Sequence, residues 1–158
     1  MRKITNPFKD LPGYNCFGCS PGNAHGLRMT FYEEGDEIIS RWDPKERFQG
    51  YLNVLHGGIQ AALMDEIASW TVYVKAKRAG VTSKMEIRYF RPVDASGGTL
   101  TLTAKLEGMR RNLADILVRL FDPERNLCAE ARITYFTYSE QKSRESLYYP
   151  EHGKFFGQ

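Results

Sequence analysis

The sequence predicts an α+β fold in which one curved antiparallel β-sheet is covered by one long helix. Only one long segment of helix-forming residues lacks internal proline and glycine, and it follows Gly58. Alternating segments typical of strands lie on both sides of it, as a hairpin before and a run of strands after. Short turns join the later strands, which indicates an antiparallel meander.

Length and composition indicate a single soluble domain. The chain has 158 residues, of which 26% are charged, an average value that argues against disorder. No run approaches the ~18 apolar residues of a membrane span, and the start of the chain lacks the apolar stretch of a signal peptide. We therefore expect a cytoplasmic protein with no membrane contact. The net charge of +3 is too small and scattered to indicate nucleic-acid binding, and it does not oppose binding of an anionic small molecule.

The elements before the long helix are an extension, a hairpin and a loop. Residues 1–26 are rich in turn formers, so we expect an ordered extension without regular structure. Strands are predicted at residues 27–32 and 37–42, joined by a turn at Gly35-Asp36. Residues 43–55 should form a loop.

The helix and the later strands complete the predicted domain, residues 27–138. The helix should run from Gly57 to Arg78, and Ala79-Gly80 should end it after a basic last turn. The tail, residues 139–158, is polar, but its aromatic residues allow part of it to dock: Tyr148, Tyr149, Phe155 and Phe156. The later strands are expected at residues 81–89, 99–106, 113–121 and 128–138.

Plotted at 100° per residue, the predicted helix has three faces. A large apolar face should lie in the concavity of the sheet: Ile59, Leu63, Ile67, Trp70 and Val74. A second face should meet water: Gln60, Met64, Thr71, Lys75 and Arg78. A third face of mainly small residues suits either ordinary helix packing or close approach of a second copy: Ala61, Ala62, Asp65, Ala68, Ser69, Val72 and Ala76.

Two carboxylates of this helix are candidates for acid–base chemistry. Asp65 lies in the middle of the small-residue face, where an unpaired buried carboxylate would be costly, so it should be near solvent or placed for use. Glu66 lies at the edge of the large apolar face and remains its rival. The helix is preceded by His56-Gly57-Gly58, whose glycines let a ligand approach the unpaired N–H groups of the first turn. Such a terminus can stabilise an anion or an oxyanion.

These residues carry a resemblance to a known family. The stretch Phe48–Glu66, FQGYLNVLHGGIQAALMDE, resembles the signature of the hotdog-fold acyl-CoA thioesterases of the phenylacetate-pathway (PaaI-like) type. Residues 80–93 are similar to the strand after the helix in that family, and residues 16–27 to the extension of a subset. The resemblance implies a hotdog fold, a curved sheet wrapped around one long central helix. It also implies hydrolysis of an acyl-CoA to a free acid and coenzyme A, without a metal or other cofactor.

The resemblance also implies roles for individual positions. The Gly57 N–H would hold the thioester carbonyl oxygen, with His56 supporting the loop, and Asp65 would activate water or attack the carbonyl itself. Thr82 lies where family members often place a hydroxyl that orients the water. Many relatives carry asparagine where this chain has Gly50, so the neighbouring Gln49 would have to substitute. The candidate substrate-binding residues are Gln49, Gly50, Gly58, Ser83 and Glu66.

Helix geometry adds a constraint on assembly. Gly57 and Asp65 are eight residues apart, about 12 Å along one helix, so they cannot touch the same carbonyl group. Two antiparallel copies related by a two-fold axis near Ala61 would place Gly57 of one chain opposite Asp65 of the other. We therefore expect a homodimer or homotetramer with shared active sites.

Other interpretations of the sequence remain open. A non-catalytic acyl-CoA binding or sensing protein would have the same fold and helix terminus, and a hotdog dehydratase would need a differently placed histidine. Cys16 and Cys19 have the spacing of metal ligands, but a second pair is missing and Cys128 is remote. Structural thiols are therefore favoured over a metal site or a redox role. Basic residues that could meet the phosphates of coenzyme A are Arg28, Lys84, Arg88, Arg91, Arg110 and Arg111.

Overall fold

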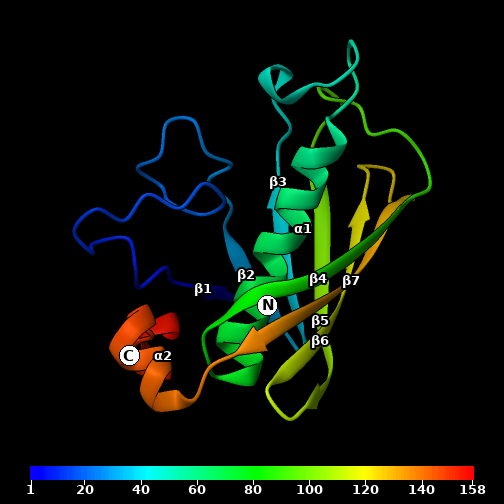
Figure 1. The fold of residues 1–158 in the computed structure, drawn as a ribbon. Helices are drawn as coiled ribbons and strands as arrows, with labels where there is room; N and C mark the ends of the chain where they lie inside the picture. Colours follow the sequence, from blue (N-terminus) through cyan, green and yellow to red (C-terminus); the bar gives the residue numbers. More distant parts are fainter.

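The computed structural model describes residues 1–158 and contains one seven-stranded antiparallel sheet that curves around a central helix, α1 (Gly57–Thr71) (Figure 1). The predicted α+β fold is confirmed. Along the sheet the strand order is β1-β2-β3-β5-β6-β7-β4. The strands are β1 (Arg2–Ile4), β2 (Phe31–Glu34), β3 (Glu37–Trp42), β4 (Gly80–Tyr89), β5 (Leu100–Arg110), β6 (Leu113–Phe121) and β7 (Leu127–Thr137).

The strand topology places β4 at one edge of the sheet. Strands β5, β6 and β7 form the expected meander, but β4 pairs with β7 and the chain then returns to β5, which lies beside β3. In the β4–β7 ladder Thr82 pairs with Tyr135 and Lys84 with Thr134, so Ser83 is the extra residue of a β-bulge. The outer edge of β4 has no partner strand in this chain.

The first strand of the predicted hairpin begins later than expected. Residues 27–30 are not in the sheet, because the N–H groups of Leu27 and Met29 donate to carbonyls of Phe17 and Gly18 in the extension. Arg28 between them is left-handed, with φ 54°. The extension itself is not free of regular structure, since β1 pairs with β2, and the loop before the helix contains a 3-10 turn, η1 (Glu46–Phe48).

The central helix begins as predicted and ends earlier. His56 caps it, because its Nδ1 accepts a hydrogen bond from the Gly58 N–H at 2.8 Å. A π-helical turn, η2 (Val72–Ala76), follows α1, and Lys77 takes the left-handed conformation that we expected of a glycine. Gly80 already belongs to β4, where a Cβ would lie 2.6 Å from the Phe136 carbonyl oxygen. Position 80 therefore needs glycine because β4 packs closely against β7, and not because the helix ends there.

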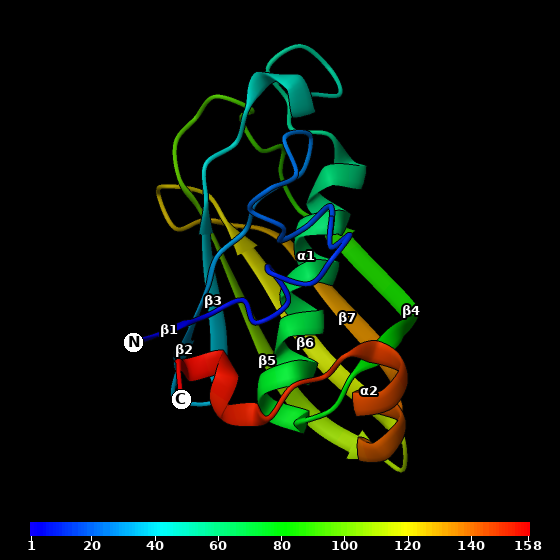
Figure 2. The ribbon, with the colours of Figure 1, turned by 90° about the vertical axis from the view of Figure 1, so that its left-hand side faces the viewer.

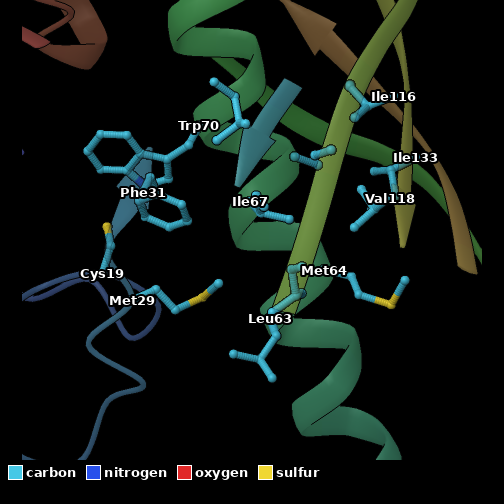
Figure 3. Close-up of a cluster of buried hydrophobic side chains, with 14 of the residues drawn as sticks. Cys19, Met29, Phe31, Leu63, Met64, Ile67, Trp70, Ile116, Val118 and Ile133 are labelled. Carbon is cyan, nitrogen blue, oxygen red and sulfur yellow. The ribbon is translucent and has the colours of Figure 1, made fainter. Parts of the chain in front are cut away.

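The water-facing side of the helix was predicted wrongly. Gln60, Met64 and Thr71 have exposed fractions of only 4%, 0% and 0%. The sheet curves around α1 and covers this side as well, so Met64 extends toward the sheet residues labelled in Figure 3. On the other side Trp70 stacks on Phe31 of β2 with ring centroids 4.7 Å apart (Figure 3). A helical wheel drawn from the sequence does not show how far the sheet curves around the helix.

The two ends of the chain cover the side of α1 that the sheet leaves free. Figure 2, viewed from that side, shows the extension and the tail in front of the helix. The tail forms α2 (Glu140–Leu147) and a 3-10 turn, η3 (His152–Phe156). Tyr149 and Phe155 are buried, which confirms that the tail docks, whereas Tyr148 is exposed. None of the helices is long and apolar enough to span a membrane.

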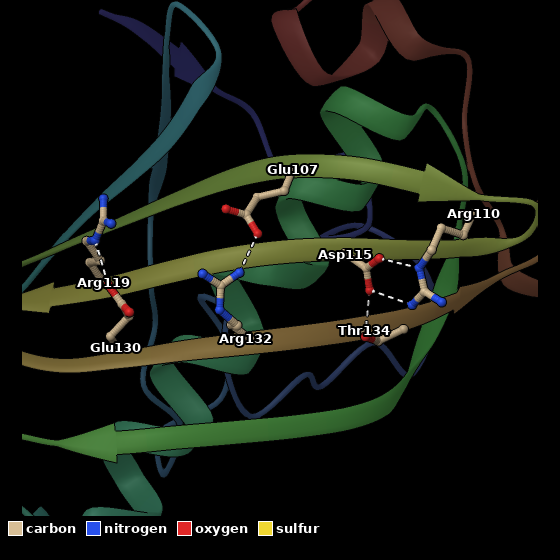
Figure 4. A network of polar contacts seen from close by, with 7 residues as sticks. All are labelled: Glu107, Arg110, Asp115, Arg119, Glu130, Arg132 and Thr134. Carbon is tan, nitrogen blue, oxygen red and sulfur yellow. Dashed lines mark hydrogen bonds and ion pairs between the residues drawn. The ribbon is translucent and has the colours of Figure 1, made fainter.

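The opposite face of the sheet, turned away from α1, carries charged pairs (Figure 4). Arg110 contacts Asp115, which also accepts a hydrogen bond from Thr134. A cavity of about 480 Å³ lies on this face; its lining includes Lys84 and Arg110, two of the basic residues that could meet the phosphates of coenzyme A, but none of the candidate catalytic or substrate-binding residues. The other two ion pairs drawn there are Arg119–Glu130 and Arg132–Glu107. The site must therefore lie elsewhere.

Candidate active site

The start of α1 presents one backbone donor without a partner. The Gly57 N–H makes no hydrogen bond within the chain, whereas the Gly58 N–H is taken by His56. The His56 carbonyl accepts from Ile59 and Gln60, so the first turn is held in place. The positive end of the helix dipole lies at the same point. The geometry is that of a site for a carbonyl oxygen that gains negative charge.

A pocket of about 480 Å³ opens beside this donor. It is lined by Gln49, Gly50, Tyr51, Val54, Leu55, His56 and Gly57. A neighbouring cavity of about 320 Å³ adds Gly58 to its lining. The structure therefore brings together five of the predicted residues: Gln49, Gly50, His56, Gly57 and Gly58.

Two of these residues shape the loop that forms the pocket. Gln49 Oε1 accepts the N–H of Asn53 at 3.0 Å, so its side chain closes the loop. A Cβ at Gly50 would lie 3.4 Å from His56 Cα and Cδ2, an ordinary van der Waals contact, so Gly50 packs directly beside the histidine that caps the helix.

The Asp65 carboxylate is held by two hydroxyl groups. Its Oδ1 accepts hydrogen bonds from Thr82 Oγ1 at 2.8 Å and from the Tyr135 hydroxyl at 2.7 Å. Thr82 and Tyr135 are cross-strand partners of β4 and β7, so the sheet places both donors on one oxygen. Oδ2 accepts no hydrogen bond within the chain and is free to act on a water molecule or substrate. Ser83, in the adjacent bulge, is exposed and does not join this group.

Sequence reasoning missed Tyr135. The side chain is 3% exposed, and burial, followed by the nearby Asp65 charge, raises its pKa. The hydroxyl therefore stays protonated and donates at neutral pH. The only signal was a tyrosine at a core position of an alternating strand, where a buried hydroxyl needs a partner. Only the strand register shows that the partner is Asp65.

Sequence reasoning also missed Tyr89, at the end of β4. Its hydroxyl donates to the Gly57 carbonyl at 2.7 Å, and its ring lies 3.7 Å from where a Gly57 Cβ would be. Tyr89 thus connects the edge strand to the first residue of the helix, while remaining 49% exposed.

Glu66 lies away from both groups. Its Oε1 accepts a hydrogen bond from Trp70 Nε1 at 3.0 Å, and the carboxyl contacts the Cys16 thiol of the extension. Burial is the main reason that the pKa of Glu66 is raised to about 7. It lines neither cavity at the helix start.

The two halves of the predicted site are separated along one helix. Gly57 and Asp65 both belong to α1, eight residues apart, which corresponds to about 12 Å. A single chain therefore presents an oxyanion donor and a carboxylate that cannot act on the same carbonyl group.

A curved antiparallel sheet wrapped around one long helix is the hotdog fold. Residues 52–129 match the family described as the thioesterase superfamily. The relative named Putative esterase SSO1253, from Saccharolobus solfataricus, is 32% identical over 126 residues, which cover 79% of this chain and 82% of that protein. The chain belongs to the thioesterase superfamily, and this membership supports thioester hydrolase activity.

Solved structures agree on the fold. The crystal structure of the thioesterase superfamily protein RHA08564 is 21% identical with a TM-score of 0.70, over 77% of this chain. This chain spans 62% of that protein, less than two thirds of its length. The crystal structure of a hypothetical thioesterase protein with coenzyme A, from Streptococcus pneumoniae, is 20% identical with a TM-score of 0.65. That match covers 70% of this chain and 86% of the other.

Proposed function

We propose that the protein is an acyl-CoA thioesterase that hydrolyses the thioester to a free acid and coenzyme A. The main support for this proposal is the hydrogen bonding of Asp65. The hydroxyl groups of Thr82 and Tyr135 hold one carboxylate oxygen and leave the other free. A general base needs this arrangement, because it must point a lone pair at one water molecule. Coenzyme A is proposed as the thiol part because the S. pneumoniae relative was crystallised with it.

In the proposed reaction, Asp65 takes a proton from a water molecule as the water oxygen bonds to the thioester carbon. The carbonyl oxygen becomes an oxyanion, which the Gly57 N–H and the helix dipole stabilise. The carbon–sulfur bond then breaks, and the proton on Asp65 passes to the departing thiolate. Direct attack by Asp65, through an anhydride, uses the same residues. Thr82 and Tyr135 act as positioning residues for the carboxylate.

We propose that two chains share each site, as a homodimer or as part of a homotetramer. The distance of about 12 Å between Gly57 and Asp65 requires a second chain to complete the site. The edge strand β4 has no partner on its outer side, and its second residue, Val81, is 46% exposed. Free strand edges with apolar side chains favour pairing with another chain. A cytoplasmic location is part of the proposal, since all three cysteines are free.

The experiment that tests this function is thiol release from a panel of acyl-CoA substrates of different chain length. Wild type should release coenzyme A, and Asp65→Asn should lower kcat by about 10²- to 10⁴-fold. Asp115→Asn is the matched control, because Asp115 lies on the opposite face of the sheet and should leave kcat unchanged. Activity of Asp65→Asn near wild type would reject the assignment, and Glu66→Gln would then test the rival carboxylate.

Binding without turnover would support the alternative function, a non-catalytic acyl-CoA sensor. The glycine at position 50, where many relatives carry asparagine, is the feature that favours this alternative. A calorimetric titration with a non-hydrolysable acyl-CoA analogue distinguishes the two outcomes. Binding together with no thiol release from any substrate of the panel would contradict the proposed enzyme.

A further inference from the structure

The fold brings Cys16, Cys19 and Glu66 together on the side of α1 opposite the proposed active site. Their Sγ and carboxylate oxygen atoms all lie within 4.8 Å of one another. The two cysteines come from one turn of the extension, whereas Glu66 is fifty residues further along the chain than Cys16. From the sequence, only His25 lies near the two thiols and Cys128 is remote; the fold supplies Glu66 as the third ligand.

We propose that Cys16, Cys19 and Glu66 bind one thiophilic divalent cation, Zn²⁺ by the chemistry of its ligands. Zinc takes thiolate and carboxylate ligands at about 2.3 Å and about 2.0–2.2 Å, so tetrahedral geometry separates the sulfur and oxygen atoms by about 3.5–3.7 Å. The Cys16 Sγ lies 3.6 and 3.7 Å from the two Glu66 oxygens. The Cys16 and Glu66 ligand atoms are thus already spaced for one ion, and Cys19 Sγ lies within 4.8 Å of both; the ion would replace the acidic protons of the three side chains.

Each of the three ligand side chains has a hydrogen-bond partner besides the metal-ligand contacts. The Cys19 N–H donates to Cys16 Sγ at 3.4 Å, and the Tyr14 hydroxyl lies 2.9 Å from Cys19 Sγ. Trp70 Nε1 donates to Glu66 Oε1 at 3.0 Å. Metal ligands in proteins characteristically have such outer partners, which fix the ligand rotamer.

Gly18 shows how closely the turn is fitted to Glu66. A Cβ at this position would lie 2.3 Å from the Glu66 carboxyl carbon, so only glycine allows the carboxylate to reach the turn between the two cysteines. The glycine is therefore required by the contact between Glu66 and the cysteine turn.

The surroundings suit a cation and leave one coordination position open. Glu66 forms no ion pair, and the cavity of about 220 Å³ beside the cluster is lined by no lysine, arginine or histidine. A +2 ion would offset two of the three negative charges of the deprotonated ligands without a basic side chain. The hydroxyls of Tyr14 and Ser69 line the same cavity, where a water molecule would complete four-coordination. The bound ion would tie the extension to α1 one residue from Asp65.

Cobalt(II) titration of the full-length, chelator-treated and reduced protein tests the site, with Co²⁺ alone as the probe. Wild type should bind one equivalent and show thiolate-to-cobalt charge-transfer absorption with the visible bands of tetrahedral cobalt, and Zn²⁺ should abolish both. Cys128→Ser is the matched control, since Cys128 is remote in β7, and should behave as wild type. Cys16→Ser should lose much of the charge-transfer absorption.

Glu66→Gln separates loss of a ligand from loss of the fold. The substitution keeps the size of the side chain and the acceptor for Trp70, so circular dichroism should be unchanged, while Co²⁺ affinity should fall more than about 10-fold. Folded, reduced wild type without charge-transfer absorption would overturn the proposal, as would a Cys16–Cys19 disulfide that forms in preference to metal binding. The readout needs no substrate, so a failed thioesterase assay and a failed metal titration refute different claims.

Discussion

Gly57→Pro removes the proposed oxyanion donor with little other change. Gly57 is the first residue of α1, a position that accepts proline because its N–H has no partner within the helix. His56 before it has φ −59° and ψ 133°, the extended conformation that a residue preceding proline prefers. Position 57 also has space, since an added Cβ would meet its nearest atoms, those of Tyr89, at 3.7 Å. The variant should therefore fold normally and lack one donor.

The expected loss follows from what one preorganised donor contributes. Removal of an oxyanion-hole hydrogen bond lowers kcat by about 10²- to 10³-fold, or about 2.7–4 kcal/mol of transition-state stabilisation. The assay is thiol release from the best acyl-CoA of the panel, with urea unfolding to show that stability is retained. Both kcat and kcat/KM should fall, because the proline Cδ replaces the amide hydrogen and also occupies space next to the bound carbonyl oxygen.

Gly57→Ala is the matched control for Gly57→Pro. It adds a Cβ in ordinary contact with Tyr89 but keeps the N–H, so it should lose far less activity than the proline variant. If folded Gly57→Pro is as active as Gly57→Ala, the Gly57 amide does not hold the oxyanion and the proposed mechanism is refuted.

Two further variants test the support of the carboxylate and the charge on the opposite face. Tyr135→Phe should lower the free energy of unfolding by about 1–3 kcal/mol in urea, because Asp65 loses a charge-assisted hydrogen bond, and kcat should fall by about 10-fold. An unchanged kcat would show that Thr82 alone positions Asp65. Arg110, and then Thr134, hold the pKa of Asp115 below its usual value, so this carboxylate stabilises the protein above the pKa of the unfolded chain and loses that effect as pH falls. Asp115→Asn should therefore be less stable than wild type by at most about 1 kcal/mol at pH 7, and thermal unfolding should show the difference vanish in acid; a difference that grows in acid would contradict the assignment.

The sequence predicted the elements well where local patterns decide them. The strands at 37–42 and 113–121 have the predicted bounds, because turn residues mark their ends. The position of β4 could not be predicted from local sequence patterns. Its pairing with β7 rather than with β5, the next strand in the sequence, depends on the arrangement of the whole sheet. The burial of Met64 and Thr71 has the same origin, because it depends on how far the sheet curves.

The part of the candidate site at the start of α1 could be predicted from the sequence. The contacts that hold Asp65 and Glu66 in place could not. His56, Gly57 and the surrounding loop are contiguous in sequence and meet in one pocket. Tyr135 reaches Asp65 from seventy residues away through strand register, which no spacing in the sequence reveals. Glu66 reaches the cysteine turn because the extension folds back over α1, an arrangement set by the packing of its aromatic residues.

The most direct test of a site shared between chains is a mixture of two inactive variants. Gly57→Pro and Asp65→Asn chains are unfolded and refolded together, so that mixed dimers form. In a shared-site dimer, each mixed pair has one site with both defects and one with none. An equal mixture should therefore regain about one quarter of wild-type activity, as each chain supplies what the other lacks. If every site lies within one chain, the refolded mixture will be no more active than the two variants refolded separately.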